Sequence, residues 1–187
     1  MRTVRTIFTN LHRYVFWALI SFVFWAWIFT LITDAPKEKK LTVCASLDSV
    51  SVREFSYELE KKKPEGIRLI RVKSSEEEKV SAENGLRSDV YIVPESLISE
   101  IAELLAPLEG FAAEGGYAVE GKLIGIPVSD PENGLRIASR FIDYPKGGNE
   151  KYYICVSASS VHSGTEGAKD GAALELARLI LSFDTEG

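Results

Sequence analysis

A run of residues near the N-terminus carries no charged side chain and constrains the chain more than any other feature. It extends from Tyr14 to Thr33 and reads YVFWALISFVFWAWIFTLIT. At about 1.5 Å per residue, a helix of this length crosses the ~30 Å hydrocarbon layer of a bilayer. A lone segment in lipid must be helical, because lipid offers no partner for backbone N–H and C=O groups. The sequence therefore predicts a transmembrane helix over residues 14–33.

A cleaved signal peptide is the alternative interpretation of this segment. The apolar core of a signal peptide usually has ~7–15 residues and ends at small residues. Here the apolar run is longer and rich in aromatic side chains, and Ala35 is followed by Pro36. The length favours an uncleaved membrane anchor.

The flanking charges predict the orientation of the anchor. Arg2, Arg5 and Arg13 precede it and favour a cytoplasmic N-terminus, although three lysines follow it within seven positions. We expect a single-pass protein of the cell membrane with its C-terminal domain outside the cytoplasm. Its parts would be a cytoplasmic tail, the transmembrane helix, a charged linker and an extracytoplasmic domain (1–13, 14–33, 34–40 and 41–187).

The chain after the apolar run is acidic. All three arginines before Asp34 belong to the tail, which leaves 19 Lys and Arg against 27 Asp and Glu, or −8 formal charges. Binding to nucleic acid needs a basic face, so this composition argues against a nucleic-acid partner. The basic triplet Lys61–Lys63 is typical of the solvated C-terminal end of a helix.

The domain alternates strand patterns with helix patterns, which predicts an α/β fold with a mainly parallel sheet and helices on both faces. We expect strands at LTVCASL, IRLIRVK, DVYIV and KYYICVSAS, and two short strands around a tight turn at Glu120–Gly121. IRLIRVK alternates apolar and basic side chains in part, as a strand near a sheet edge does. Helices are expected before Pro64, between Ser96 and Pro107, and over Ala172–Phe183.

The third strand leads directly into a helix. Pro94 lacks an N–H donor and should end the strand, and Ser96 can cap the helix that follows. A stripe of apolar residues at helical spacing should then pack into the core. It consists of Leu97, Ile98, Ile101, Leu104 and Leu105.

The order of these segments resembles the extracellular solute-binding proteins of ABC importers, which have the type 2 periplasmic-binding fold. Asp89–Pro94 is similar to the family's "D-v-y/f-i-v-p" strand, and Leu105–Leu108 to its "L-a-P-L" helix end. Glu120–Val128 is similar to "dG-k-l-y-G-i-P-v", and the final helix to "A-l-e-l-a-k-y-l-l". Together these similarities cover most of Leu41–Phe183.

One departure from the family changes what the resemblance implies. Family members bind a solute between two lobes, whereas this chain has residues for about one lobe of ~100–150 residues. Pro131–Glu150 occupies the place where the second lobe would be inserted and is too short to form it. The resemblance therefore implies a membrane-tethered first lobe without the opposing wall of the cleft.

Candidate ligand-binding residues follow from the rule that open α/β sheets bind ligands at the carboxyl ends of their strands. The same residue types are also common in turns and caps. The candidates lie after the first, third and last strands: Ser46, Asp48, Ser49, Pro94, Glu95, Ser96, Ser157, Ser159 and Ser160.

Catalytic and metal-binding patterns are weak, and we expect no enzyme activity, cofactor or metal. His162 is the only histidine of the domain, and no G-x-S-x-G motif accompanies it, so we expect a solvated loop residue. Glu76–Glu78 should be a solvated acidic run. Cys44 and Cys155 have no metal-ligand spacing, and a strand separates them in the resembling fold, so we expect two buried free thiols.

The leading functional hypothesis is a non-catalytic, membrane-anchored solute-binding-like protein, accessory to ABC-type uptake. Its partners would be the membrane and an ABC permease or another membrane protein, with a small-molecule ligand of unknown identity. The alternative is a protein–protein interaction module derived from such a lobe, with no small-molecule ligand.

Overall fold

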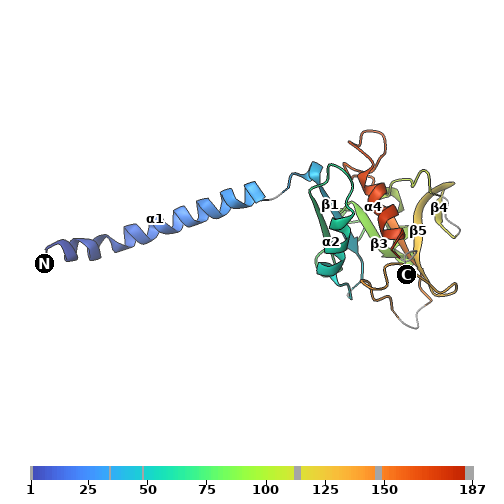
Figure 1. Ribbon diagram of the computed structural model, residues 1–187, viewed down its shortest axis with the longest axis horizontal. Coiled ribbons are helices and arrows are strands. Elements are labelled where there is room, and N and C mark those ends of the chain that lie inside the picture. The colour runs from blue at the N-terminus through green and yellow to red at the C-terminus, as the bar shows by residue number, and fades with distance from the viewer. Residues whose placement is uncertain (1, 34, 48, 112–114, 146–148, 184–187) are drawn as a thin grey trace. The chain divides into compact units, whose positions relative to one another are not determined.

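The chain divides into two units, Met1–Pro36 and Lys37–Gly187. A computed structural model describes all residues except 1, 34, 48, 112–114, 146–148 and 184–187 (Figure 1). The first unit is a single helix, and the second is an α/β domain, so the two are described separately below.

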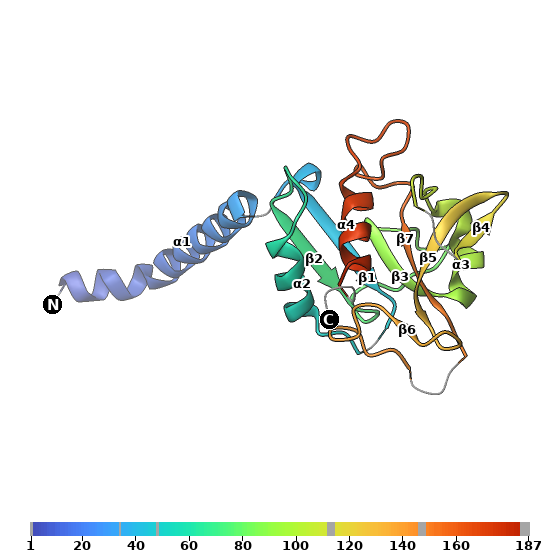
Figure 2. The same cartoon turned by 45° about the vertical axis from the view of Figure 1, so that its right-hand side comes forward.

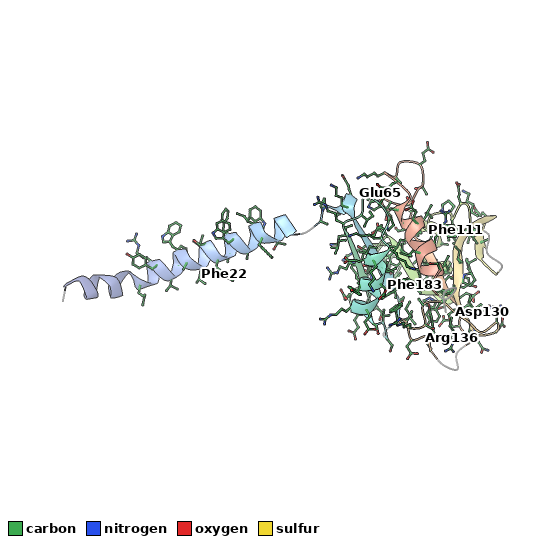
Figure 3. All side chains as sticks on the ribbon, viewed as in Figure 1. Phe22, Glu65, Phe111, Asp130, Arg136 and Phe183 are labelled. Atoms are coloured by element: carbon green, nitrogen blue, oxygen red, sulfur yellow. The ribbon has the colours of Figure 1, made fainter. Side chains whose placement is uncertain are left out.

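The first unit consists of helix α1, Arg2–Thr33, which contains the predicted transmembrane segment. Within it, Arg13–Thr30 is long and apolar enough to cross a membrane, and none of this stretch is buried by protein. Its large side chains project outward, as Phe22 shows with 73% of its surface exposed (Figure 3). A helix with apolar side chains on all sides suits a lipid environment.

The second unit contains the predicted strands and helices in the predicted order, together with short additional elements. The first half comprises η1 (Lys37–Lys39), β1 (Lys40–Ala45), α2 (Val52–Lys61), β2 (Leu69–Lys73), β3 (Val90–Pro94), α3 (Glu95–Ile101) and η2 (Ala102–Leu104). The second half comprises β4 (Tyr117–Val119), β5 (Lys122–Asp130), β6 (Leu135–Arg136), β7 (Tyr152–Val156) and α4 (Ala172–Leu181).

The strands form one mixed sheet, and the prediction of a mainly parallel sheet is wrong. The strand order is β2-β1-β3-β7-β5-β4, with β6 paired to β5. Among the described strands the parallel pairs are β1 with β2 and β1 with β3, whereas β7 lies antiparallel to both β3 and β5. A strand buried on both faces has the same apolar pattern in either direction, so the sequence did not reveal the direction of β7.

Helices cover both faces of the sheet (Figure 2). Alternate residues of β1, β3 and β7 point to opposite faces, as the pleat requires. On one face they pack with Phe55 and Leu59 of α2 and with Leu176 and Ile180 of α4. On the other face they pack with Ile98 and Ile101 of α3. The core is therefore two layers separated by the sheet.

The two cysteines lie on separate strands as buried free thiols, as predicted. Cys44 is on β1 and Cys155 on β7, β3 runs between these strands, and both thiols are buried and free. Burial, with a smaller contribution from the charge of Glu78, raises the pKa of the Cys44 thiol to about 12. Burial also raises the pKa of Cys155 well above its ordinary value.

The tight turn predicted at Glu120–Gly121 joins β4 and β5. Its two residues have φ of 51° and 77°, so both central positions are left-handed. Two-residue hairpin turns favour this conformation because it matches the right-handed twist of the strands.

Candidate functional site

The predicted ligand-binding residues do not come together. β1 and β3 are parallel, and β7 runs antiparallel to β3. The residues after β7 therefore lie at the opposite end of the strands from the residues that follow β1 and β3. Asp48 lies outside the described residues.

Ser46 and Ser49, after β1, line a small pocket that we call the strand-end pocket. Its other lining residues are Leu47, Asp143, Tyr144, Pro145 and Tyr152, and its volume is about 400 Å³. One side chain of this group, Asp143, is formally charged.

Pro94, Glu95 and Ser96 do not line this pocket. Pro94 is the last residue of β3 and the N-cap of α3, so it marks the predicted corner. No side-chain hydrogen bond caps α3. Instead, the Ser96 hydroxyl donates to a carboxylate oxygen of Glu150, so the prediction that Ser96 caps the helix is wrong.

The three serines after β7 lie beside the start of β3. The Ser157 backbone N–H donates to the carbonyl of Asp89 at 2.9 Å, and the Ser157 and Ser159 hydroxyls are hydrogen-bonded to each other at 2.9 Å. Ser159 and Ser160 line a larger cavity of about 590 Å³. We call this cavity the basic pocket, because it is lined by Lys37, Lys40, Arg71, Lys73 and Arg87.

The alternation along β2 creates the basic pocket. Ile70 and Val72 are buried in the core layer that α2 covers, so Arg71 and Lys73 point to the other face of this edge strand. Arg71 is paired in register with Thr42 of β1, which also lines the pocket. The sequence IRLIRVK correctly predicted an edge strand, and its two basic residues form one wall of the pocket.

Acidic side chains pair with two of the five cations that line the basic pocket. Lys73 Nζ lies 2.6 Å from Glu78 Oε2, and Arg71 Nη2 lies 3.2 Å from Glu77 Oε2. Within the described part of the chain, the side chains of Lys37 and Arg87 have no ion-pair partner. These two cations therefore face the cavity without an internal counterion.

Glu78 is buried, with 8% of its surface exposed, and the prediction that it belongs to a solvated run is wrong. Its Oε2 accepts hydrogen bonds from Lys73 and from the Ser88 hydroxyl, at 2.6 and 2.7 Å. Its Oε1 accepts one from the Tyr91 hydroxyl at 2.6 Å and one from the Arg87 backbone N–H at 3.2 Å. Burial alone would raise the pKa of Glu78, but these side-chain donors outweigh it and lower the pKa.

The remaining charged group of the basic pocket is Asp89. Its Oδ2 accepts the Thr42 backbone N–H at 2.7 Å, and its Oδ1 accepts the Ser160 hydroxyl. Burial raises the pKa of Asp89, although these two donors oppose the shift. The carboxylate therefore connects the loop after β7 to the start of β3 by a hydrogen bond.

His162 is fully buried, so the prediction of a solvated loop residue is wrong. Its Nδ1 lies 2.6 Å from Asp170 Oδ1, and its Nε2 lies 3.3 Å from the carbonyl oxygen of Lys37. The Ser160 hydroxyl donates to Asp89 rather than to the imidazole. His162 thus joins the segment before β1 to the loop before α4, and it does not hold a serine nucleophile.

No protein-family model and no curated protein matches the chain. The site must be interpreted from its own geometry. Among the residues that the structure describes, no three His, Cys, Asp or Glu side chains are grouped to hold a metal ion.

The cations that line the basic pocket suit it to an anionic group. The basic pocket offers ammonium and guanidinium groups beside the hydroxyl of Ser159. Sequence reasoning named Ser159 and Ser160 but missed the five cations, which come from three separate segments of the chain. The alternation of basic residues in IRLIRVK was the one local signal of this wall.

Proposed function

We propose that the chain is a non-catalytic, membrane-anchored binding protein whose α/β domain lies outside the cytoplasm and takes a small molecule in the basic pocket. The observation that carries this proposal is the cavity of about 590 Å³ on the face of β1 and β2 opposite α2. Ligand sites in proteins commonly have volumes of ~300–1,000 Å³. A role accessory to ABC-type uptake is the expectation that the resemblance to solute-binding proteins adds.

The proposal of a membrane anchor is based on helix α1. The apolar stretch Arg13–Thr30 is of spanning length, and three arginines precede or begin it. Arginines on one flank favour the cytoplasmic side for that flank. The topology is tested by adding protease to intact cells that carry a C-terminal tag. We expect digestion of residues 37–187 without permeabilisation, and protection of the domain until permeabilisation would refute the orientation.

Binding is tested by thermal unfolding of the full chain in a neutral detergent, against a panel of sugars, peptides, metal ions and anions. A ligand present at about 100 times its dissociation constant adds ~2.7 kcal/mol to the free energy of unfolding. Ser159→Trp should fill the basic pocket and abolish the response. The matched variant Ser49→Trp fills the strand-end pocket and should leave the response unchanged.

A docking module for another polypeptide is the second candidate. It is favoured by the single sheet of Lys37–Gly187, because a clamp of the solute-binding kind closes between two lobes. A flat response of the whole panel, together with a specific crosslink from the domain to one membrane protein, would favour this candidate over small-molecule binding.

A further inference from the structure

We propose that the ligand of the basic pocket is a small molecule bearing a phosphate group. This inference rests on the proposed function, because it names the chemical class that the same cavity binds. It is carried by the arrangement of charge around the cavity, by the types of donor present and by the size of the space.

The charge around the cavity is positive in a domain that is otherwise acidic. Arg71 and Lys73 are paired with Glu77 and Glu78, whereas Lys37 and Arg87 have no ion-pair partner among the described residues and together bring +2 charges to the cavity. Gathering like charges opposes folding unless an opposite charge compensates them. A phosphate monoester carries about −1.5 to −2 charges near pH 7, which matches this excess better than a single carboxylate does.

An anionic ligand group does not have to compete with Asp89 for the same hydrogen-bond donors. Both oxygens of that carboxylate accept hydrogen bonds from within the fold, one from the Thr42 backbone N–H and one from Ser160. The groups left to face a ligand are the cations Lys37 and Arg87. A guanidinium group binds phosphate through two parallel hydrogen bonds, so Arg87 is the residue we assign to direct contact with the phosphate.

The cavity is larger than an isolated phosphate ion needs, so an organic group should accompany the phosphate. That group can belong to a free phosphate ester or to the headgroup of a phospholipid. The lipid source is tested because Lys37 follows Thr33, the last residue of α1, by four positions in the sequence.

The first experiment measures binding of glucose 6-phosphate, pyrophosphate, citrate and glucose to the full chain in neutral detergent by calorimetry. We expect the two phosphate compounds to bind, citrate to bind at least tenfold more weakly, and glucose not to bind. The affinity for phosphate compounds should fall as KCl is raised, because salt screens exposed charges.

Substitutions of single cations test which residue contacts the phosphate. Arg87→Gln should weaken binding of glucose 6-phosphate at least tenfold, and Lys37→Gln should weaken it to a smaller extent. Arg136→Gln removes an exposed arginine on β6, outside the pocket, and should leave the affinity unchanged. Equal loss in Arg87→Gln and Arg136→Gln would overturn the assignment of Arg87.

The second experiment separates the two sources of phosphate. The full chain is placed in nanodiscs of phosphatidylcholine alone or with phosphatidylinositol phosphate. If a headgroup occupies the pocket, the second lipid should suppress binding of pyrophosphate. If pyrophosphate binds equally well in both, the ligand is a free phosphate ester, and the assignment to phosphate stands in either case.

The outcomes also distinguish this inference from the proposed function. Binding of glucose or citrate that Ser159→Trp abolishes, with no binding of phosphate compounds, would overturn the phosphate class and leave the binding function intact. No binding by any probe or any member of the wider panel would overturn both.

Discussion

At the scale of single residues, Glu78 has the most demanding environment among the groups around the basic pocket. It is a buried carboxylate whose two oxygens each accept two hydrogen bonds, from Lys73, Ser88, Tyr91 and the backbone of Arg87. A buried charge is tolerated when it is paired and fully hydrogen-bonded. Through these bonds Glu78 holds the segment between β2 and β3 against the sheet and fixes one cation of the pocket wall.

We predict that Glu78→Gln lowers the free energy of unfolding by about 3 kcal/mol, because the amide leaves buried donors without an acceptor and Lys73 without its counterion. Urea denaturation at pH 7 measures this change. Glu77→Gln is the matched control, since the pair between Glu77 and Arg71 is exposed and should contribute less than about 1 kcal/mol. Equal effects of the two substitutions would contradict the assigned role of Glu78.

The same carboxylate predicts a pH dependence. Its pKa is lowered in the folded state, so its contribution is complete above the unfolded pKa of about 4.3 and is lost as the pH falls through the folded value. The difference in stability between the natural chain and Glu78→Gln should therefore be constant from pH 7 down to about 5 and shrink below pH 4. Denaturation series at these pH values test it.

At the scale of elements, the β4–β5 hairpin depends on two left-handed residues in succession. Glu120 has φ of 51° and Gly121 has φ of 77°. A side chain at a left-handed position is strained, whereas glycine adopts this conformation readily. The hairpin therefore contains one residue that suits its conformation and one that does not.

We predict opposite effects of substitution at these two positions. Glu120→Gly should stabilise the domain by up to about 1 kcal/mol, since the strain at a left-handed residue is relieved. Gly121→Val should destabilise it by about 1–2 kcal/mol because a β-branched residue is poorly tolerated at positive φ. Thermal unfolding of both variants measures the signs, and destabilisation by Glu120→Gly would contradict the conformation of the turn.

The elements also show how far the sequence alone predicts this fold. Periodicity identified β1, β2, β3, β7, α2, α4 and the hairpin, because a period of two or of 3.6 residues is a local property of the chain. The direction of β7 depends on how the chain returns to the sheet, which no local pattern records. Ser96 is a good capping residue by type, but its hydroxyl bonds to Glu150, 54 positions away in the sequence.

The candidate site was predicted less well than the fold, for the same reason. Its residues come from segments as far apart as Lys37 and Ser160, and only the register of β1 with β2 places Thr42 beside Arg71. Burial of Glu78 and His162 could not be inferred, since acidic and histidine residues in loops are usually solvated. Local composition predicts exposure, whereas these two side chains are buried by distant partners.

At the scale of the whole molecule, the division of the chain into two units predicts that the domain folds without helix α1. The residues of both core layers lie between Leu41 and Phe183, so the hydrophobic contacts are complete within the second unit. A fragment of residues 37–187 should unfold cooperatively in urea and retain the stability of the domain in the full chain. Loss of cooperative unfolding in this fragment would contradict the division into units.

The start of the fragment matters because His162 bonds to the carbonyl of Lys37. A second fragment beginning at Leu41 lacks this acceptor and the first residue of β1. We predict that it is less stable than the fragment of residues 37–187 by at least about 1–2 kcal/mol, because it also loses the Lys39 carbonyl that accepts the Arg68 N–H at 2.8 Å. Equal stability of the two fragments would show that the contacts of residues 37–40, that of His162 included, contribute nothing.

The place of β1 in the sheet has a mechanical consequence. The polypeptide that leaves α1 enters the domain at β1, and β1 is hydrogen-bonded on both sides, to β2 and to β3. Detaching β1 would therefore break two hydrogen-bonded ladders at once, whereas a strand at the end of the sheet is held by one ladder alone. A domain entered at an inner strand in this way resists being opened by force applied at its N-terminal end.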